Sequence, residues 1–360
     1  MPDVLLFGAT GYTGTLTARA LARRGAETIL AGRHPARLEA LASEVGANDI
    51  AVVEVGDVAG LVAALGDVKA MITCVGPFSK LGHTAVEAAL EAGTHYVDST
   101  GEISFVAELI DRYDARARER GIVIAPALGF DEVPSDVALS LAVDGLSDAD
   151  AVVTYSLPGR PSMGTVRTIV TGIGHRSGVW IRDGRIVEVA TGQHSRWSPL
   201  PPPLGPKYAI SMPFSEGRLA PLHLELRTLE LYGAVGRPTA TAMRAGVPLI
   251  RALSMLGPAR RIVEAALDAP RGGPDENTRR KDRWALLAEA HCAEGWRNVT
   301  VMGSDPYGLT AETLAAGALK LARDGHESAG VLAPVQTLGL QTWQKELIDV
   351  GVDIQVYEPA

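Results

Sequence analysis

The stretch that decides the fold is VLLFGATGYTGTLTARALARRG, residues 4–25. Its first four residues form an apolar run suited to a buried strand, and residues 15–24 follow a helical pattern. Three glycines, Gly8, Gly11 and Gly14, occupy the turn between them, although glycine weakens both strands and helices. Such glycines indicate a place where the backbone turns sharply or approaches another group closely.

This turn predicts a dinucleotide-binding site. At the start of a helix the first amide groups have no backbone partners and the helix dipole adds partial positive charge, so a phosphate binds well there. The spacing is G-x-x-G-x-x-G, with Ala9 where the commoner G-x-G-x-x-G fingerprint has its second glycine. The alternative is a tight turn without a ligand. The turn residues predicted to bind the cofactor are Gly8, Thr10, Gly11, Tyr12, Thr13 and Gly14.

The end of the second predicted strand favours NADP over NAD. Enzymes that prefer NAD usually carry an acid about 20 residues after the glycines, where it accepts a hydrogen bond from the ribose 2′-hydroxyl. Here the strand over residues 27–31 is followed by Arg33, with no carboxylate before Glu39. A guanidinium can form paired hydrogen bonds with a 2′-phosphate, and Arg37 could assist. The alternative is an ordinary solvated arginine at a strand end.

Strand and helix signals alternate up to about residue 130, a pattern that is typical of a doubly wound parallel sheet. Ligands of such sheets bind outside the carboxyl ends of the strands, so the residues at those ends are the informative ones. No metal site is expected. The strand-end residues that we predict to contact the cofactor are Asp57, Gly76, Pro77, Phe78 and Ser99.

Three acids at strand ends, Asp98, Glu102 and Asp131, are the candidate catalytic proton donors. Burial could keep a carboxyl group partly protonated at such a place. The alternative is that these acids cap neighbouring helices. Tyr307 and Thr310 are candidates for closing the cleft from the other end. Since the sequence has no Tyr-x-x-x-Lys pair and no G-x-S-x-G elbow, we expect the cofactor to supply the chemistry.

Composition and charge exclude several classes of protein. The net charge of −8 and the pI of about 5.6 argue against binding to nucleic acid or to an anionic membrane surface. Cys74 and Cys292 show no metal spacing and no disulfide framework, as expected in a reducing compartment. The longest apolar segment, residues 245–257, is too short to span a bilayer, and the first strand begins too early for a signal peptide. We therefore expect a cytoplasmic protein with no integral membrane segment.

Beyond residue 136 apolar and polar positions alternate, as in antiparallel strands with one covered face. Residues 178–190 form the clearest hairpin pattern, with Asp183-Gly184 at the turn. A mostly helical section is expected from about residue 239 to 269. We predict an α/β fold of three parts: a Rossmann-type NADP-binding domain over residues 1–136, an inserted α+β substrate domain over residues 137–306, and C-terminal helices and a strand over residues 307–360 that return to the first domain.

Seven motifs are distributed along the chain: GATGYTG (8–14), AGR (31–33), VGPF (75–78), HYVDSTGE (95–102), GFDEVPSD (129–136), GSDPYGLTAETL (303–314) and GVLAPVQTLG (330–339). Together they resemble the saccharopine dehydrogenase-like oxidoreductases, and within that group the branch that includes the trans-acting enoyl reductases of actinobacterial lipid assembly. The resemblance spans nearly the whole chain and is most specific in the first 136 residues and after Gly303.

This resemblance implies an NADP-binding lobe, an inserted substrate lobe and C-terminal helices that pack back. Members of the group reduce imines made from an amino acid and an aldehyde, or carbon–carbon double bonds conjugated to a carbonyl. We predict an NADPH-dependent reductase of an enoyl substrate; the alternatives are an imine reductase and a non-catalytic NADP(H) sensor. The expected partner is a small-molecule or acyl-chain substrate. A homodimer stays open, and no nucleic acid is expected.

Overall fold

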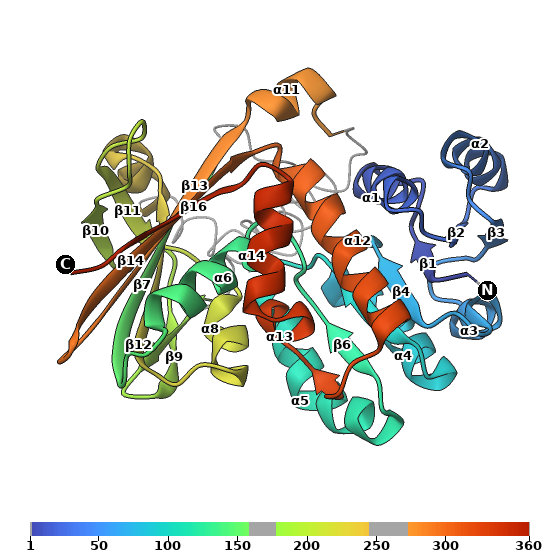
Figure 1. Ribbon diagram of the computed structural model, residues 1–360, viewed down its shortest axis with the longest axis horizontal. Helices are drawn as coiled ribbons and strands as arrows, with labels where there is room; N and C mark the ends of the chain where they lie inside the picture. Colours follow the sequence, from blue (N-terminus) through green and yellow to red (C-terminus); the bar gives the residue numbers. More distant parts are fainter. Residues whose placement is uncertain (1, 158–177, 245–272, 360) are drawn as a thin grey trace, which may run out of the picture. The chain divides into compact units, whose positions relative to one another are not determined.

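The computed structural model describes residues 2–157, 178–244 and 273–359 (Figure 1). The chain divides into two compact units, each assembled from two segments of the sequence. The first unit contains Met1–Val133 and Pro306–Glu346, and the second contains Pro134–Asp305 and Leu347–Ala360.

A parallel sheet forms the centre of the first unit. Its order among the described residues is β15-β6-β5-β4-β1-β2-β3. The strands β1, β4 and β6 are buried along their whole length, as expected where helices cover both faces of a parallel sheet. The strands are β1 (Val4–Phe7), β2 (Thr28–Gly32), β3 (Asp49–Val52), β4 (Ala70–Thr73), β5 (His95–Asp98), β6 (Val123–Ala125) and β15 (Gly330–Val331).

Helices connect these strands and end where the sequence supplies glycine. Gly46, Gly93 and Gly121 each follow a helix and adopt the left-handed conformation, which carries no steric cost without a side chain. The helices of this unit are α1 (Tyr12–Arg23), α2 (Pro35–Val45), α3 (Val58–Leu65), α4 (Phe78–Ala92), α5 (Ile103–Arg120), α12 (Pro306–Asp324) and α13 (Pro334–Leu338).

The strand order reverses at β1, which lies between β2 and β4. In the parallel register Phe7, the last residue of β1, lies beside Thr73, the last residue of β4. The loops that leave these two strands therefore diverge from one point at the carboxyl edge. Such a topological switch point is where open α/β sheets bind their ligands.

A mixed nine-stranded sheet forms the second unit. Its main order is β10-β11-β12-β7-β13-β14-β16, and β8 pairs with both β12 and β9. The pair β12 with β7 is parallel, and the other pairs that the structure describes are antiparallel. The strands are β7 (Ala149–Ser156), β8 (Gly178–Arg182), β9 (Arg185–Val189), β10 (Ser195–Ser198), β11 (Lys207–Ser211), β12 (Leu226–Ala234), β13 (Arg283–Cys292), β14 (Gly295–Ser304) and β16 (Asp353–Tyr357).

The two faces of this second sheet differ in polarity. Along β7, Ala151, Val153 and Tyr155 are buried on an apolar face, while Thr154 and Ser156 point to the opposite face. We call the face with Thr154 and Ser156 the polar face. The remaining helices are α6 (Glu132–Val143), α8 (Glu216–Leu219), the short 3₁₀ helix η1 (Ala220–Leu222), α11 (Glu276–Lys281) and α14 (Leu340–Asp349).

The second sheet differs from the sequence expectation at its last strand. We expected the final strand beside the first domain, but β16 pairs with β14 of the second sheet. In the basic run RRKDR at residues 279–283, a pattern that is typical of a solvated helix face, Arg279 is only 8% exposed and forms an ion pair with Asp305 at 3.1 Å. Most of the expected helical section at residues 239–269, from residue 245 on, lies outside the described residues.

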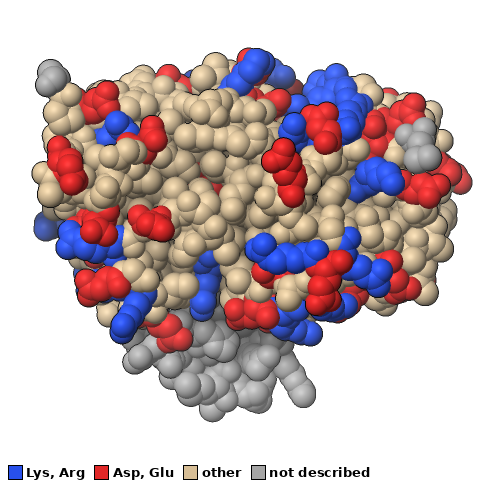
Figure 2. Space-filling view, turned by 60° about the horizontal axis from the view of Figure 1, so that its bottom comes forward, with Lys and Arg blue, Asp and Glu red and all other residues tan. Residues whose placement is uncertain are grey.

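Charged side chains of both signs are interspersed on the face drawn in Figure 2. Acidic and basic groups alternate there over short distances, so their fields partly cancel on that face. In the part of the chain that the structure describes, none of the helices combines the length and the apolar character needed to cross a membrane.

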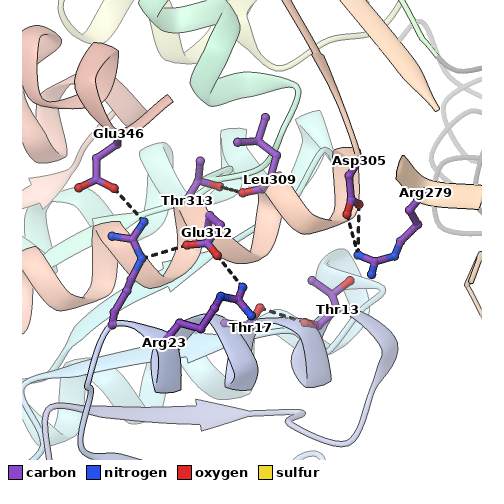
Figure 3. A network of polar contacts seen from close by, with 10 residues as sticks. Thr13, Thr17, Arg23, Arg279, Asp305, Leu309, Glu312, Thr313 and Glu346 are labelled. Atoms are coloured by element: carbon purple, nitrogen blue, oxygen red, sulfur yellow. Dashed lines mark hydrogen bonds and ion pairs between the residues drawn. The ribbon is translucent and has the colours of Figure 1, made fainter. Parts of the chain in front are cut away.

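A network of ion pairs ties α1 to α12 and α14 (Figure 3). Arg23 donates to Glu312 at 2.6 Å, and Arg24 reaches the other oxygen of the same carboxylate at 3.0 Å. Arg24 also donates to Glu346 at 2.8 Å. These contacts join the end of the helix that follows the glycine turn to residues 288 to 322 positions later in the sequence.

Candidate active site

The glycine turn lies at the switch point of the first sheet. Gly8 has φ +82°, and a Cβ atom there would lie 2.8 Å from Val75 Cγ2 in the loop after β4. A Cβ atom on Gly14 would lie 2.2 Å from the Gly8 carbonyl oxygen and 2.9 Å from Ala9 Cα. Both positions therefore require glycine for the packing of the chain itself.

Gly11 is different, because the surrounding protein atoms leave room for a side chain at this position. Its φ of −74° and ψ of 170° suit any residue. Among the described atoms, a Cβ at this position would have one close neighbour, the Gly8 carbonyl oxygen at 3.2 Å, which a small shift would relieve. Gly11 is exposed at the start of α1, where no side chain caps the helix. A pyrophosphate on the amides of this helix start fits the open space that a side chain would fill.

The other predicted turn residues surround this space. Thr10 and Thr13 are half-buried. The ring of Tyr12 packs edge-on against the ring of Tyr307 at the start of α12, with centroids 5.2 Å apart. The packing joins the predicted pyrophosphate turn to α12, whose Thr310 accepts a hydrogen bond from the Phe130 backbone at 3.1 Å.

Arg33 lies directly after β2, at the end of the strand that neighbours β1. Its side chain is exposed, and Nε lies 3.2 Å from Nε2 of His34. Arg37 follows on the exposed side of α2. In the described residues neither guanidinium pairs with a carboxylate, so both can bind an anion.

Two predicted site acids serve as caps. The Asp57 carboxylate accepts from the amide of Gly60 at 2.8 Å and caps α3. The two oxygens of Glu102 accept from the amides of Phe78 at 2.7 Å and Ser79 at 3.1 Å, so Glu102 caps α4 from the neighbouring loop. Both carboxylates sit at helix starts, where the dipole favours their negative charge.

Asp98 is fully buried at the end of β5. Oδ1 accepts from the amides of Thr100 at 2.8 Å and Ala127 at 2.9 Å, and Oδ2 accepts from the hydroxyl of Tyr96 at 2.6 Å. Burial raises the pKa of the Asp98 carboxyl to about 6, although the three donors oppose this shift. Asp98 therefore joins the loop after β5 to the loop after β6.

Asp131 is the predicted acid whose carboxylate accepts no hydrogen bond from any residue that the structure describes. It is half-buried in the loop after β6. A Cβ atom on Gly129 would lie 3.0 Å from Asp131 Oδ1, and one on Gly101 would lie 3.7 Å from Oδ2. The carboxylate thus lies over two glycines from neighbouring strand ends, with Ser99 beside them.

Glu132 was not among the acids expected from the sequence. It is 2% exposed, and its Oε2 would lie 3.8 Å from a Cβ atom on Gly129. The structure therefore brings Asp131, Glu132, Ser99 and the glycines of two loops together at one edge. The signal that could have found Glu132 is its position next to Asp131 in the motif GFDEVPSD.

Phe78 lies at the start of α4 after the cis peptide bond between Gly76 and Pro77. Its ring packs against Phe105 of α5, with centroids 5.9 Å apart, and Gly76 is exposed beside it. Among the described residues, no group of three or more His, Cys, Asp or Glu side chains has the arrangement of a metal site.

A glycine turn between a buried strand and a helix, placed at the switch point of a parallel sheet, defines a dinucleotide-binding domain of the Rossmann class. Residues 4–125 match the family model described as the saccharopine dehydrogenase NADP binding domain. The predicted resemblance is confirmed over this part of the chain, and with it NADP as the cofactor.

Curated relatives agree with this match over part of their length. The trans-acting enoyl reductase of Mycobacterium ulcerans is 39% identical over 141 residues, which are 38% of this chain and 34% of the relative. A putative trans-acting enoyl reductase of Mycobacterium tuberculosis is 36% identical over 182 residues, which are 47% of this chain and 43% of the relative. The chain thus spans less than half the length of these relatives.

A solved structure supports the fold over the whole chain. Apo saccharopine dehydrogenase (L-Glu forming) from Saccharomyces cerevisiae superposes with a TM-score of 0.66 at 15% identity and covers 100% of both chains. At this identity the likeness concerns the fold alone. The expected Rossmann-type sheet with a second α+β part is confirmed.

Proposed function

We propose that this chain is an NADPH-dependent reductase that transfers a hydride to a carbon–carbon double bond conjugated to a carbonyl group. The observation that carries the cofactor part of the proposal is Gly11: its backbone accepts any residue, yet this exposed position at the start of α1 has no side chain. The names of the curated relatives support enoyl reduction as the reaction class.

Residues of the first unit have separate tasks in this proposal. The turn from Gly8 to Gly14 binds the pyrophosphate, and Arg33 binds the 2′-phosphate. Gly76, Pro77 and Ser99, at the ends of β4 and β5, lie beside the nicotinamide part of the cofactor. When bound, NADPH supplies the hydride.

Asp131 is the proposed proton donor to the carbon next to the carbonyl. Its carboxylate accepts no hydrogen bond within the described residues, whereas Asp98 and Glu102 are held by two or three donors each. Asp98 and Glu102 then act as positioning residues that fix the loops after β4, β5 and β6. Asp57 caps α3 at the edge of the cofactor site.

The domain division is part of the same proposal: residues 1–136 bind NADP, residues 137–306 bind the substrate and residues 307–360 complete the molecule. We place the protein in the cytoplasm on the ground of its use of NADPH and its free Cys74 and Cys292. A homodimer stays a hypothesis that analytical ultracentrifugation can test.

A screen of NADPH oxidation tests the proposed reaction. We expect turnover with 2-enoyl thioesters and none with imines formed from amino acids and aldehydes. Asp131→Asn should lower the rate of the chemical step by about 100-fold or more with little change in NADPH affinity. The matched control is Asp111→Asn, an exposed acid on α5. Wild-type turnover by Asp131→Asn would show that the proton comes from another group.

A further inference from the structure

Two aromatic rings and two arginines gather on one face of β10 and β11, where the second sheet ends. Trp197 of β10 lies directly opposite Tyr208 of β11, and their rings meet edge-on with centroids 5.7 Å apart. The guanidinium of Arg237 lies 5.6 Å from the centroid of each ring, and Arg244 donates to the Tyr208 hydroxyl at 3.3 Å. We call these four residues the cationic aromatic patch.

The two arginines of the patch are held by neutral groups. Residues 237–244 are helical, so Arg237 and Arg244, two turns apart, lie on the same side of that helix. Nε of Arg244 donates to the Gly192 carbonyl oxygen at 2.8 Å. Neither guanidinium forms an ion pair with a carboxylate of any residue that the structure describes. Both can therefore bind an anion, for which a guanidinium provides paired hydrogen bonds.

The two stretches of sequence that build the patch contain no acid. Residues 189–215 and 231–244 have no Asp or Glu, although the whole chain has 42 acids and a net charge of −8. The Arg196–Glu289 ion pair of β10 belongs to the opposite face, because neighbouring side chains of a strand alternate. The patch is thus built from positively charged stretches of an acidic chain, and charge complementarity selects an anionic ligand.

The patch is also accessible to a ligand. Trp197 is 55% exposed, and Arg237 and Arg244 are exposed beside it. An indole in this position buries little apolar area, so packing of the sheet does not account for it. An exposed indole can stack a planar base, and a guanidinium matches the geometry of a phosphate. An acidic protein segment would pair with the arginines but brings no planar base for the indole.

We propose that the cationic aromatic patch binds a nucleoside phosphate, with the base on Trp197 and the phosphate groups on Arg237 and Arg244. This site is separate from the glycine turn, which belongs to the first unit. Adenine nucleotides bring the same chemistry from two sources: a free nucleotide such as ATP, or coenzyme A as the carrier of an acyl thioester. The inference goes beyond the proposed reduction and does not depend on it.

Calorimetric titration of the full chain loaded with NADPH, with the excess removed, tests the patch apart from the cofactor site. The probes are ATP, coenzyme A and inorganic pyrophosphate. Arg237→Gln and Arg244→Gln should each weaken binding of all three by about tenfold or more, because a charge-assisted contact to phosphate is lost. Trp197→Leu should weaken ATP and coenzyme A by about fivefold or more and leave pyrophosphate binding nearly unchanged, since Tyr208 still holds Arg237.

Two control variants match these in residue type and exposure. Trp296→Leu removes an indole of β14 that is 44% exposed, and Arg185→Gln removes an exposed arginine of β9. Both should bind the three probes as the wild type does. Stronger binding of coenzyme A than of ATP identifies an acyl carrier as the natural ligand, and the reverse order identifies a free nucleotide.

Two results would overturn the inference. If neither ATP nor coenzyme A binds to the loaded wild type, the patch is not a nucleotide site, and an acidic protein segment becomes the partner to test. If all three patch variants bind the nucleotides at wild-type affinity, the nucleotides bind elsewhere on the chain. Enoyl reduction fails separately, in the screen of NADPH oxidation, which does not involve the patch.

Discussion

Arg33 and Asp98 illustrate two roles of single residues in the first unit: Arg33 is proposed to bind the cofactor, and Asp98 stabilises the fold. Arg33 is exposed at the end of β2, where the sequence predicts a 2′-phosphate contact. Asp98 is buried and bonded to three donors, so its charge acts on the stability of the loops around it.

Replacing Arg33 should change the choice of cofactor. Arg33→Ala loses a charge-assisted contact to the 2′-phosphate, which is worth about 1.5 to 3 kcal/mol, so NADPH should bind roughly tenfold or more weakly. NADH affinity should stay the same, because NADH has no 2′-phosphate. Fluorescence titration with both cofactors measures this, with Arg120→Ala at the end of α5 as the control. Equal affinity of the wild type for NADPH and NADH would contradict the assignment.

Asp98 should make the free energy of unfolding depend on pH. Its pKa is raised from 3.8 to about 6 in the folded state, so the folded chain holds a proton that the unfolded chain has released between these values. The contribution of Asp98 to the free energy of unfolding is therefore fully present below pH 3.8 and is lost as the pH rises through about 6. Two pKa units correspond to about 3 kcal/mol.

Asp98→Asn should remove this dependence while keeping the fold. Asn Oδ1 can accept the amides of Thr100 and Ala127, and its NH₂ group can donate to the Tyr96 oxygen. Between pH 4.5 and pH 6.5 the free energy of urea unfolding of the variant should lack the fall that Asp98 causes in the wild type. Glu119→Gln, an exposed acid, is the control and should unfold as the wild type does. A variant with the wild-type slope would show that another group titrates.

The elements of the first unit were largely predictable because their signals are local. The apolar run at Val4–Phe7, the glycines after it and the alternation of strands and helices all lie within short windows. The contacts that fix the candidate site are not local: Glu102 caps a helix that starts 24 residues earlier, and Asp98 bonds to Ala127. No window of sequence displays such pairs, so the roles of these acids could not be predicted from it.

Strand β13 was not predicted, and its composition explains why. RWALLAEAHC is rich in alanine and leucine, which favour helices. Pairing with β7 on one side and β14 on the other outweighs that preference. Strand β16 was expected beside the first domain, but it pairs with β14. The sequence of a strand does not determine which strand it pairs with, so this neighbour could not be predicted.

The turn between β1 and α1 yields a prediction that separates binding from folding. Gly11→Val should abolish binding of NADPH and NADH and leave the thermal unfolding temperature nearly unchanged, because the backbone there accepts a side chain. Gly14→Ala is the matched comparison and should lower the unfolding temperature, because its Cβ would lie 2.2 Å from the Gly8 oxygen. If Gly11→Val binds NADPH at wild-type affinity, the turn is architectural.

The two units of the molecule have different tasks in the proposed reaction. The first unit carries the glycine turn, Arg33 and the unpaired carboxylate of Asp131 at one sheet edge. The second carries a mixed sheet with the half-buried Lys207 beside Ser156 on its polar face. In the proposed reductase, the first unit binds the hydride source and the second unit binds the substrate.

The fate of the hydride tests this account most directly. NADPH carrying deuterium at C4 is incubated with the full chain and a 2-enoyl thioester, and the product is analysed by NMR and mass spectrometry. We predict one deuterium at the β-carbon of a saturated thioester and a solvent-derived hydrogen at the α-carbon. Recovery of unreduced thioester with all the deuterium still on the cofactor would contradict the central claim.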